Sequence, residues 1–177
     1  QVLQVILDAM ESYHNPEISL HGASIMATLA NMDPSSHDLL MEVESYATMI
    51  TMVTEYEDNK AIRTTCFSYL QSIFADKTHC LKICHREGLP FLVHGLEKKK
   101  HEKLISYLNV LTTVFNHSLS KKIIINCGVL EKLFSIFRKN AEEAPVIAAA
   151  LQLLKSLLTN PEVIHIDSYM KEEERLS

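Results

Sequence analysis

Four pentapeptides decide the fold of this chain: ATLAN at residues 27–31, QSIFA at 71–75, TTVFN at 112–116 and KSLLT at 155–159. Each ends a segment in which apolar or small residues recur at the spacing of one helix face. One anchor residue holds the same place in each segment, and the anchors lie 44, 41 and 43 residues apart: Leu29, Ile73, Val114 and Leu157. A helical pattern with this period predicts an α-solenoid, in which successive helical repeats stack on one another.

A long helix is expected to end each repeat. The expected bounds are Glu17–Met32, Lys60–Ala75, Glu102–His117 and Ala144–Asn160. Residues at offsets −7, −6, −3, 0 and +1 from each anchor should be buried, because they form one apolar stripe. In the last helix this stripe comprises Ala150, Leu151, Leu154, Leu157 and Leu158. Tyr107 is much larger than the residues matching it in the other repeats, so we expect extra room around its ring.

Shorter helices should precede the long ones. Medium helices are expected at Tyr46–Tyr56, Leu89–Lys98 and Val129–Arg138, with core pairs Ile50/Val53, Val93/Leu96 and Leu133/Ile136. Short helices are expected at His37–Val43, Thr78–Arg86 and Lys121–Cys127. Gly88 and Gly128 separate the two kinds of helix and allow a sharp turn, and Ser45 stands at the matching position. Leu7 and Met10 match the core pair of a medium helix, so the first repeat is incomplete.

The repeats predict a single domain over residues 1–177. Its units are about 1–33, 34–76, 77–117 and 118–160, and a tail follows at 161–177. The charge run Lys171–Arg175 indicates that this tail frays. Because the chain does not begin with Met and its first repeat is incomplete, we interpret it as a fragment of a longer protein or a processed product.

Composition limits the kinds of partner and compartment. The net charge of −5 argues against nucleic-acid binding. There is no apolar run of about 18 residues, so no membrane span is expected. The first ten residues lack the basic region and cleavage site of a signal peptide. The four cysteines sit in helical patterns and suit reduced core positions, which favours an intracellular, cytoplasmic location.

Two consecutive units resemble armadillo repeats. The first is REGLPFLVHGLEKKK at 86–100 with a helix ending YLNVLTTVFNHS at 118. The second is INCGVLEKLFSIFRKN at 125–140 with a helix ending LQLLKSLLTN at 160. The resemblance extends over about residues 1–160, and HEAT-type repeats are the alternative. It implies an all-α, right-handed superhelix of about four repeats, whose third helices line a concave groove that holds extended peptides or helices.

The resemblance also implies which residues face that groove. Importin-alpha carries a ladder of Trp and Asn pairs on its third helices, and none of the matching sites in this chain carries such a pair. It should therefore not bind classical nuclear localisation signals. Small neutral polar residues stand there instead, and these form the expected partner-binding face: Ser24, Thr28, Ser68, Ser72, Asn109, Thr113, Gln152 and Ser156.

Two clusters invite other interpretations. Cys80 and Cys84, flanked by His79 and His85, have metal-binding residue types. However, Cys84 aligns with core residues of neighbouring repeats, so we expect packed thiols and no metal. The run Lys98–Lys100 ends a helix, where cations complement the helix dipole, or it contacts an acidic partner.

Three functions remain open at this point. The first is a non-catalytic interaction scaffold that binds a protein or peptide and needs no cofactor. The second is a structural spacer or self-association element of a larger signalling protein, with homo-oligomers forming through exposed repeat ends. The third is an enzyme, which we do not expect because no catalytic signature is present.

Overall fold

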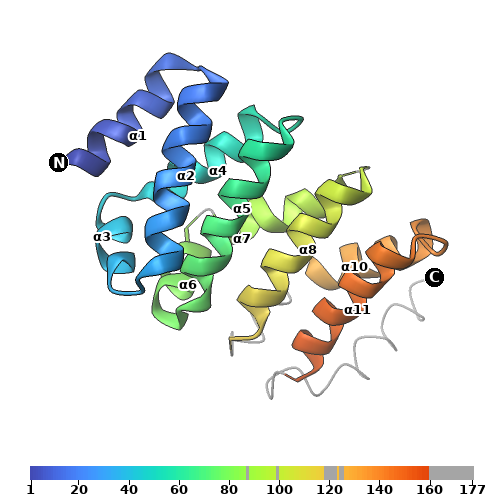
Figure 1. The fold of residues 1–177 in the computed structure, drawn as a ribbon. Helices are drawn as coiled ribbons and strands as arrows, with labels where there is room; N and C mark the ends of the chain where they lie inside the picture. Colours follow the sequence, from blue (N-terminus) through green and yellow to red (C-terminus); the bar gives the residue numbers. More distant parts are fainter. Residues whose placement is uncertain (87, 99, 118–122, 124–125, 160–177) are drawn as a thin grey trace. The chain divides into compact units, whose positions relative to one another are not determined.

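The chain is described here by a computed structural model, which covers residues 1–86, 88–98, 100–117, 123 and 126–159. Within these residues all regular secondary structure is helical (Figure 1). The helices form two compact units that divide after Phe91. None of the described helices combines the length and apolarity that crossing a bilayer requires.

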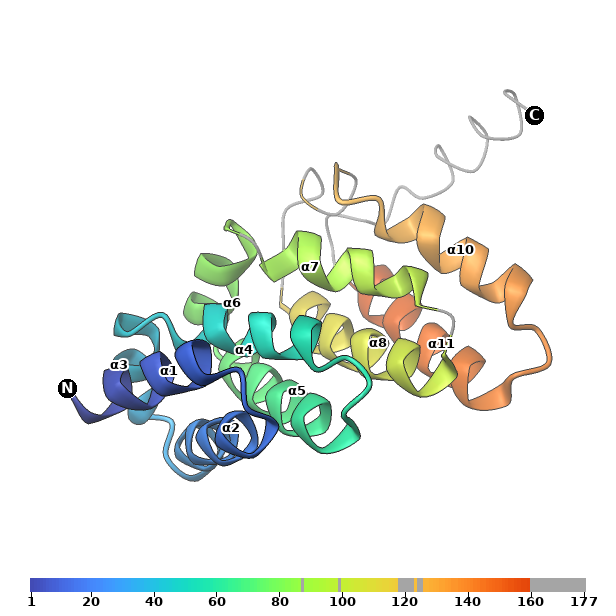
Figure 2. The same cartoon turned by 90° about the horizontal axis from the view of Figure 1, so that it is seen from above.

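The first unit stacks two long helices. Its elements are α1 (Val2–Tyr13), α2 (Pro16–Met32), α3 (Ser36–Glu42), α4 (Ser45–Glu55), α5 (Lys60–Ala75), α6 (Lys77–Cys84) and the start of α7 (Gly88–His94). The long helices α2 and α5 lie side by side (Figures 1 and 2). The medium helices α1 and α4 pack against α2 and α5, respectively, so each long helix has its own supporting helix.

The second unit repeats this arrangement. It contains the end of α7, then η1 (Gly95–Glu97), α8 (His101–Phe115), α10 (Val129–Lys139) and α11 (Ala144–Leu158). The long helices α8 and α11 again lie side by side (Figure 2). The short helix expected at Lys121–Cys127 and the tail after residue 160 fall largely or wholly outside the described residues.

Asparagine caps explain where two long helices begin. The Asn15 side chain accepts hydrogen bonds from the backbone N–H of Glu17 (2.8 Å) and Ile18 (3.3 Å). Asn59 accepts one from the N–H of Ile62 (3.2 Å). These groups have no partner inside the helix, so the asparagine oxygens satisfy them.

The expected apolar stripe is confirmed in α5 and α8, where all five positions are buried. It is wrong in part for α2 and α11. Leu29 is 36% exposed, Leu151 is 52% exposed and Leu158 is 49% exposed, while Leu154 is half-buried. The positions match, and within its own unit α2 packs on the long helix α5 and α11 packs on the long helix α8.

The room required by Tyr107 comes from Gly95. Tyr107 is 3% exposed, and a Cβ atom added at Gly95 would lie 2.1 Å from its ring. Such a separation is far inside van der Waals contact. The bulkier residue on α8 is therefore matched by an absent side chain on η1.

The expected register of the second medium helix is wrong by one residue. Met49 and Met52 are fully buried in α4, whereas Ile50 is only half-buried. The reason lies at the turn before the helix: Glu44 precedes α4 with φ 50°, just as Gly128 precedes α10 with φ 69°. Glu44 therefore matches Gly128, and Ser45 does not. A non-glycine residue in this left-handed conformation is hard to foresee from sequence.

Candidate functional site

A neutral hollow of about 480 Å³ lies between α2 and α5 in the first unit. Its walls come from one face of α2 and from the N-terminal half of α5. The lining residues are Ser24, Ala27, Thr28, Asn31, Met32, Thr64, Thr65 and Ser68. None of them is charged, so the hollow can offer hydrogen bonds and van der Waals contact but no ion pair.

Three of the residues expected to face a partner meet in this hollow: Ser24, Thr28 and Ser68. Thr28 and Ser68 are exposed and Ser24 is half-buried. The hydroxyls of Ser24 and Thr28 donate to the carbonyls of Leu20 and Ser24 within α2, each at 2.7 Å. Their oxygen lone pairs can still accept hydrogen bonds from a ligand.

Ser72, expected on the same face, joins the two helices instead. Its hydroxyl donates to the carbonyl of Ala30 at 2.7 Å. The ring of His37 also reaches this carbonyl, with Nε2 at 2.8 Å, and His37 is buried. Ser72 therefore contributes to the packing of α5 on α2 more than to a free surface.

In the second unit, too, some of the four expected residues are exposed and others are buried. Asn109 on α8 and Gln152 on α11 are exposed, and Thr113 is half-buried with its hydroxyl directed to the Asn109 carbonyl. Ser156 is only 6% exposed and its hydroxyl donates to Asn116 Oδ1 at 2.8 Å. Asn109 and Gln152 are thus the residues of this set that are open to a partner.

Two asparagines that the sequence analysis missed connect neighbouring long helices. Asn31 Nδ2 donates to Ser68 Oγ at 3.2 Å in the first unit, and Asn116 accepts from Ser156 in the second. Both are the last residue of their pentapeptides, ATLAN and TTVFN. The recurrence of asparagine at this place is visible in the sequence and could have identified both residues.

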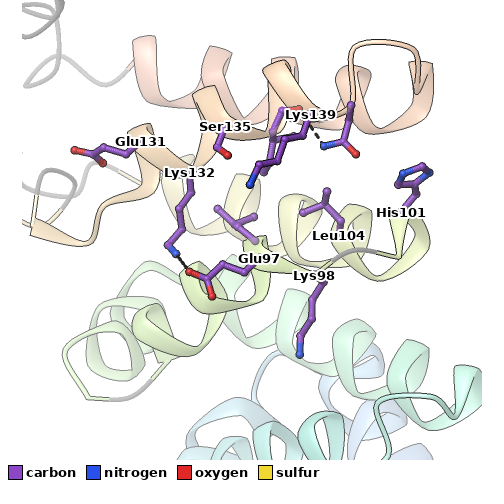
Figure 3. A pocket seen from close by; sticks show the side chains of 11 residues that line it. Glu97, Lys98, His101, Leu104, Glu131, Lys132, Ser135 and Lys139 are labelled. Atoms are coloured by element: carbon purple, nitrogen blue, oxygen red, sulfur yellow. Dashed lines mark hydrogen bonds and ion pairs between the residues drawn. The ribbon is translucent and has the colours of Figure 1, made fainter. Parts of the chain in front are cut away.

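A second, charged hollow of about 680 Å³ lies between η1, α8 and α10 (Figure 3). Its apolar part comes from Leu96, Leu104 and Ile136, and its charged rim includes Lys98, Lys132 and Lys139. Lys132 forms an ion pair with Glu97, and this pair lowers the pKa of the Glu97 carboxyl. Figure 3 shows Lys132 directed towards Glu97 and Glu131 directed away from it.

The chemistry of this hollow suits anion contact better than proton transfer. A carboxylate with a lowered pKa is a weaker base at neutral pH, so Glu97 is a poor candidate for a general base. The lysine ammonium groups can attract a carboxylate or phosphate as point charges. Lys98 links the hollow to the basic run noted in the sequence, while Lys99 lies outside the described residues.

Comparison with solved structures identifies the architecture. A designed armadillo repeat protein matches with a TM-score of 0.72 at 13% identity, over 92% of this chain and 69% of that chain. Another, in complex with the peptide (KR)4, matches with a TM-score of 0.74 at 12% identity, over 97% and 73%. The fold is that of armadillo repeat proteins.

A third solved structure also matches this chain. It is described as one of the computationally designed armadillo repeat proteins for modular peptide recognition, with a TM-score of 0.69 at 15% identity, over 88% of this chain and 64% of that chain. No protein-family model matches the sequence. No curated protein matches it either.

The cysteine and histidine cluster lies at α6 of this armadillo fold. Cys80 and Cys84 are buried with their sulfur atoms 4.0 Å apart, and His79 Nε2 lies 2.9 Å from Asp38 Oδ1. In the described part of the chain, no three His, Cys, Asp or Glu residues are grouped to hold a metal ion. On α5, burial raises the pKa of the Cys66 thiol to about 12.

Proposed function

We propose that this chain is a non-catalytic interaction module that binds an extended peptide or a helix through the exposed faces of its long helices. The observation that carries the proposal is the uncharged hollow between α2 and α5, where Ser24, Thr28 and Ser68 meet. In the second unit the corresponding contacts are Asn109 and Gln152.

The chemistry of the lining indicates the kind of partner. Serine, threonine and asparagine can pair with the backbone N–H and C=O groups of an extended segment. The hollow lacks acidic side chains, so it offers no charged partner to lysine or arginine. We therefore expect a neutral peptide, unlike the (KR)4 peptide bound by the designed protein named above. The buried thiols support a reducing, intracellular location.

The test is selection of binders from a displayed library of extended peptides, using the purified chain as bait. One double variant, Asn109→Arg with Thr113→Arg, and another, Thr28→Arg with Ser68→Arg, should each weaken binding of the selected peptides. The reason is that arginine adds bulk and unpaired charge to neutral surfaces. Glu172→Lys, in the tail, is the matched charge-changing control and should have no effect.

One result would redirect the proposal. If the selected peptides bind both arginine variants normally but lose binding when Lys98, Lys99 and Lys100 are changed to glutamine, the neutral surface is not the site. The basic run Lys98–Lys100 would then be the contact, and its ligand would be acidic.

A second candidate function is supported by apolar side chains on the outer side of α2. Ile25 is 44% exposed, Leu29 is 36% exposed and Met32 is 79% exposed. Exposed apolar residues that line up on one helix mark an interaction surface. They favour a self-association or spacer role, and Met32 is shared with the neutral hollow.

A further inference from the structure

The repeat register indicates what the exposed side of α2 is suited to contact. Ile25 lies at offset −4 from its anchor, and Leu29 is the anchor itself. The residues at these offsets in α5 are Tyr69 and Ile73, both fully buried. The equivalent pairs in α8 and α11 are fully buried as well: Val110 and Val114, and Leu153 and Leu157.

Side-chain contacts show which neighbour adjoins this side of a long helix. On α5, Ser68 and Ser72 flank Tyr69 and Ile73, and both hydroxyls are hydrogen-bonded to the preceding long helix, α2. On α11, Ser156 is bonded in the same way to Asn116, directly after α8. On α5 and α11, offsets −4 and 0 are therefore buried beside the preceding long helix of the same unit, and in α2 they are open.

The complementary side is open on α11. Leu151 and Leu158 lie at offsets −6 and +1, and they are 52% and 49% exposed. The same offsets hold Ala23 and Ala30 in α2, and Leu108 and Phe115 in α8, all at most 2% exposed. Ala30 also supplies the carbonyl that receives the Ser72 hydroxyl, so this side faces the following long helix.

We propose that copies of this chain associate head to tail, with Ile25 and Leu29 on α2 of one copy packed against Leu151 and Leu158 on α11 of the next. The contact continues the packing that α2 makes with α5, and α8 with α11, inside each unit. The proposal rests on the second candidate function and names its partner as another copy of the same chain.

Polar groups and charge fit the same pairing. Thr159 takes the place of Asn31 and Asn116 in the register, so its hydroxyl would approach Ser24 and Thr28 of the next copy. Residues 1–59 contain ten acidic side chains and no lysine or arginine. On α11 the sole charged residue is Lys155, which is exposed. The segment that includes α2 is thus acidic, whereas α11 carries a basic residue.

The contact joins two different surfaces and so is heterologous, which leads to rings or open chains of copies. Complementation by sedimentation velocity tests this. The α2 variant combines Ile25→Lys with Leu29→Lys, and the α11 variant combines Leu151→Lys with Leu158→Lys. The matched control, Thr51→Lys with Thr54→Lys, adds the same charges on exposed positions of α4.

The wild-type chain and the control should gain mass as concentration rises, and each interface variant should remain monomeric with its helical circular dichroism unchanged. An equimolar mixture of the two variants should form a one-to-one complex, because each still carries one intact surface.

Three results would overturn the proposal. One is a wild-type chain that stays monomeric throughout the concentration series. Another is loss of association in the α2 variant alone, which indicates α2 pairing with itself. The third is an equimolar mixture without a complex. Peptide binding by the monomeric variants is measured separately, so failure of head-to-tail association is distinguishable from failure of the peptide-binding proposal.

Discussion

The contact between Tyr107 and Gly95 shows how one residue can depend on the absence of a side chain elsewhere. The Tyr107 ring occupies the space that a Cβ at position 95 would need, and both residues are buried. Most helical positions prefer alanine to glycine, so a glycine in this place is explained by packing.

Gly95→Ala should therefore destabilise the fold by about 1–3 kcal/mol, the usual cost of an extra group in a packed core. Urea denaturation followed by circular dichroism measures the change. Combining Gly95→Ala with Tyr107→Ala should cost less than the two single changes added together, because the smaller residue removes the clash. Strict additivity would contradict the proposed clash.

Leu111→Ala should lower the free energy of unfolding by roughly 2–5 kcal/mol, as expected for truncation of a buried leucine. Leu111 is fully buried at offset −3 on α8. The same denaturation experiment measures it, with exposed Leu39→Ala as the comparison. A loss below about 0.5 kcal/mol, typical of surface positions, would show that the assigned repeat register is wrong.

At the scale of elements, the start of α5 depends on the Asn59 cap. Asn59→Ala removes the acceptor for the Ile62 N–H and should destabilise the fold by about 0.5–2 kcal/mol. Asn59→Ser keeps a capping oxygen and should change stability by only a few tenths of a kcal/mol. Thermal unfolding of the two variants side by side checks this, and equal losses would show that the cap is unimportant.

The long helices were the most predictable elements. The expected Lys60–Ala75 is identical to α5, and the expected bounds of α2, α8 and α11 differ by at most two residues at either end. Their apolar periods and caps are local features that the sequence displays directly. The register of α4 was missed because it depends on a left-handed Glu44, and backbone strain of that kind leaves no compositional signal.

Predicting the candidate site was harder, because surfaces depend on neighbours. The sequence placed Ser24, Thr28 and Ser68 on one face, and they line one hollow. It could not separate these from Ser72 and Ser156, since the same residue type either faces solvent or bonds to an adjoining helix. Nor could the sequence predict that Leu151 and Leu158 of α11 are exposed, because the apolar stripe of this helix resembles the stripes of the other repeats.

At the scale of the whole molecule, the binding of a selected neutral peptide should depend only mildly on salt. Few ion pairs would be screened, so raising ionic strength from low to physiological should change affinity by less than about threefold. Isothermal titration calorimetry at several salt concentrations measures this. A steep loss of affinity would point to the lysine-bearing hollow instead.

The folded chain should also retain its stability without metal. Its buried thiols pack as small apolar groups, so purification with a strong chelator should leave the unfolding midpoint unchanged. Elemental analysis of the untreated protein should find far less than one zinc per chain. A stoichiometric metal whose removal lowers the midpoint would overturn this expectation.

The rate at which the buried thiol of Cys66 is alkylated reports how often the structure around α5 opens. A thiol with a pKa of about 12 carries almost no thiolate at neutral pH, and alkylating reagents attack only the thiolate. Modification of Cys66 must therefore wait until α5 separates from its neighbours, whereas Cys127 is half-buried and lies in the second unit. Mass spectrometry can measure the two labelling rates. Their ratio would show whether the first and second units open together or independently.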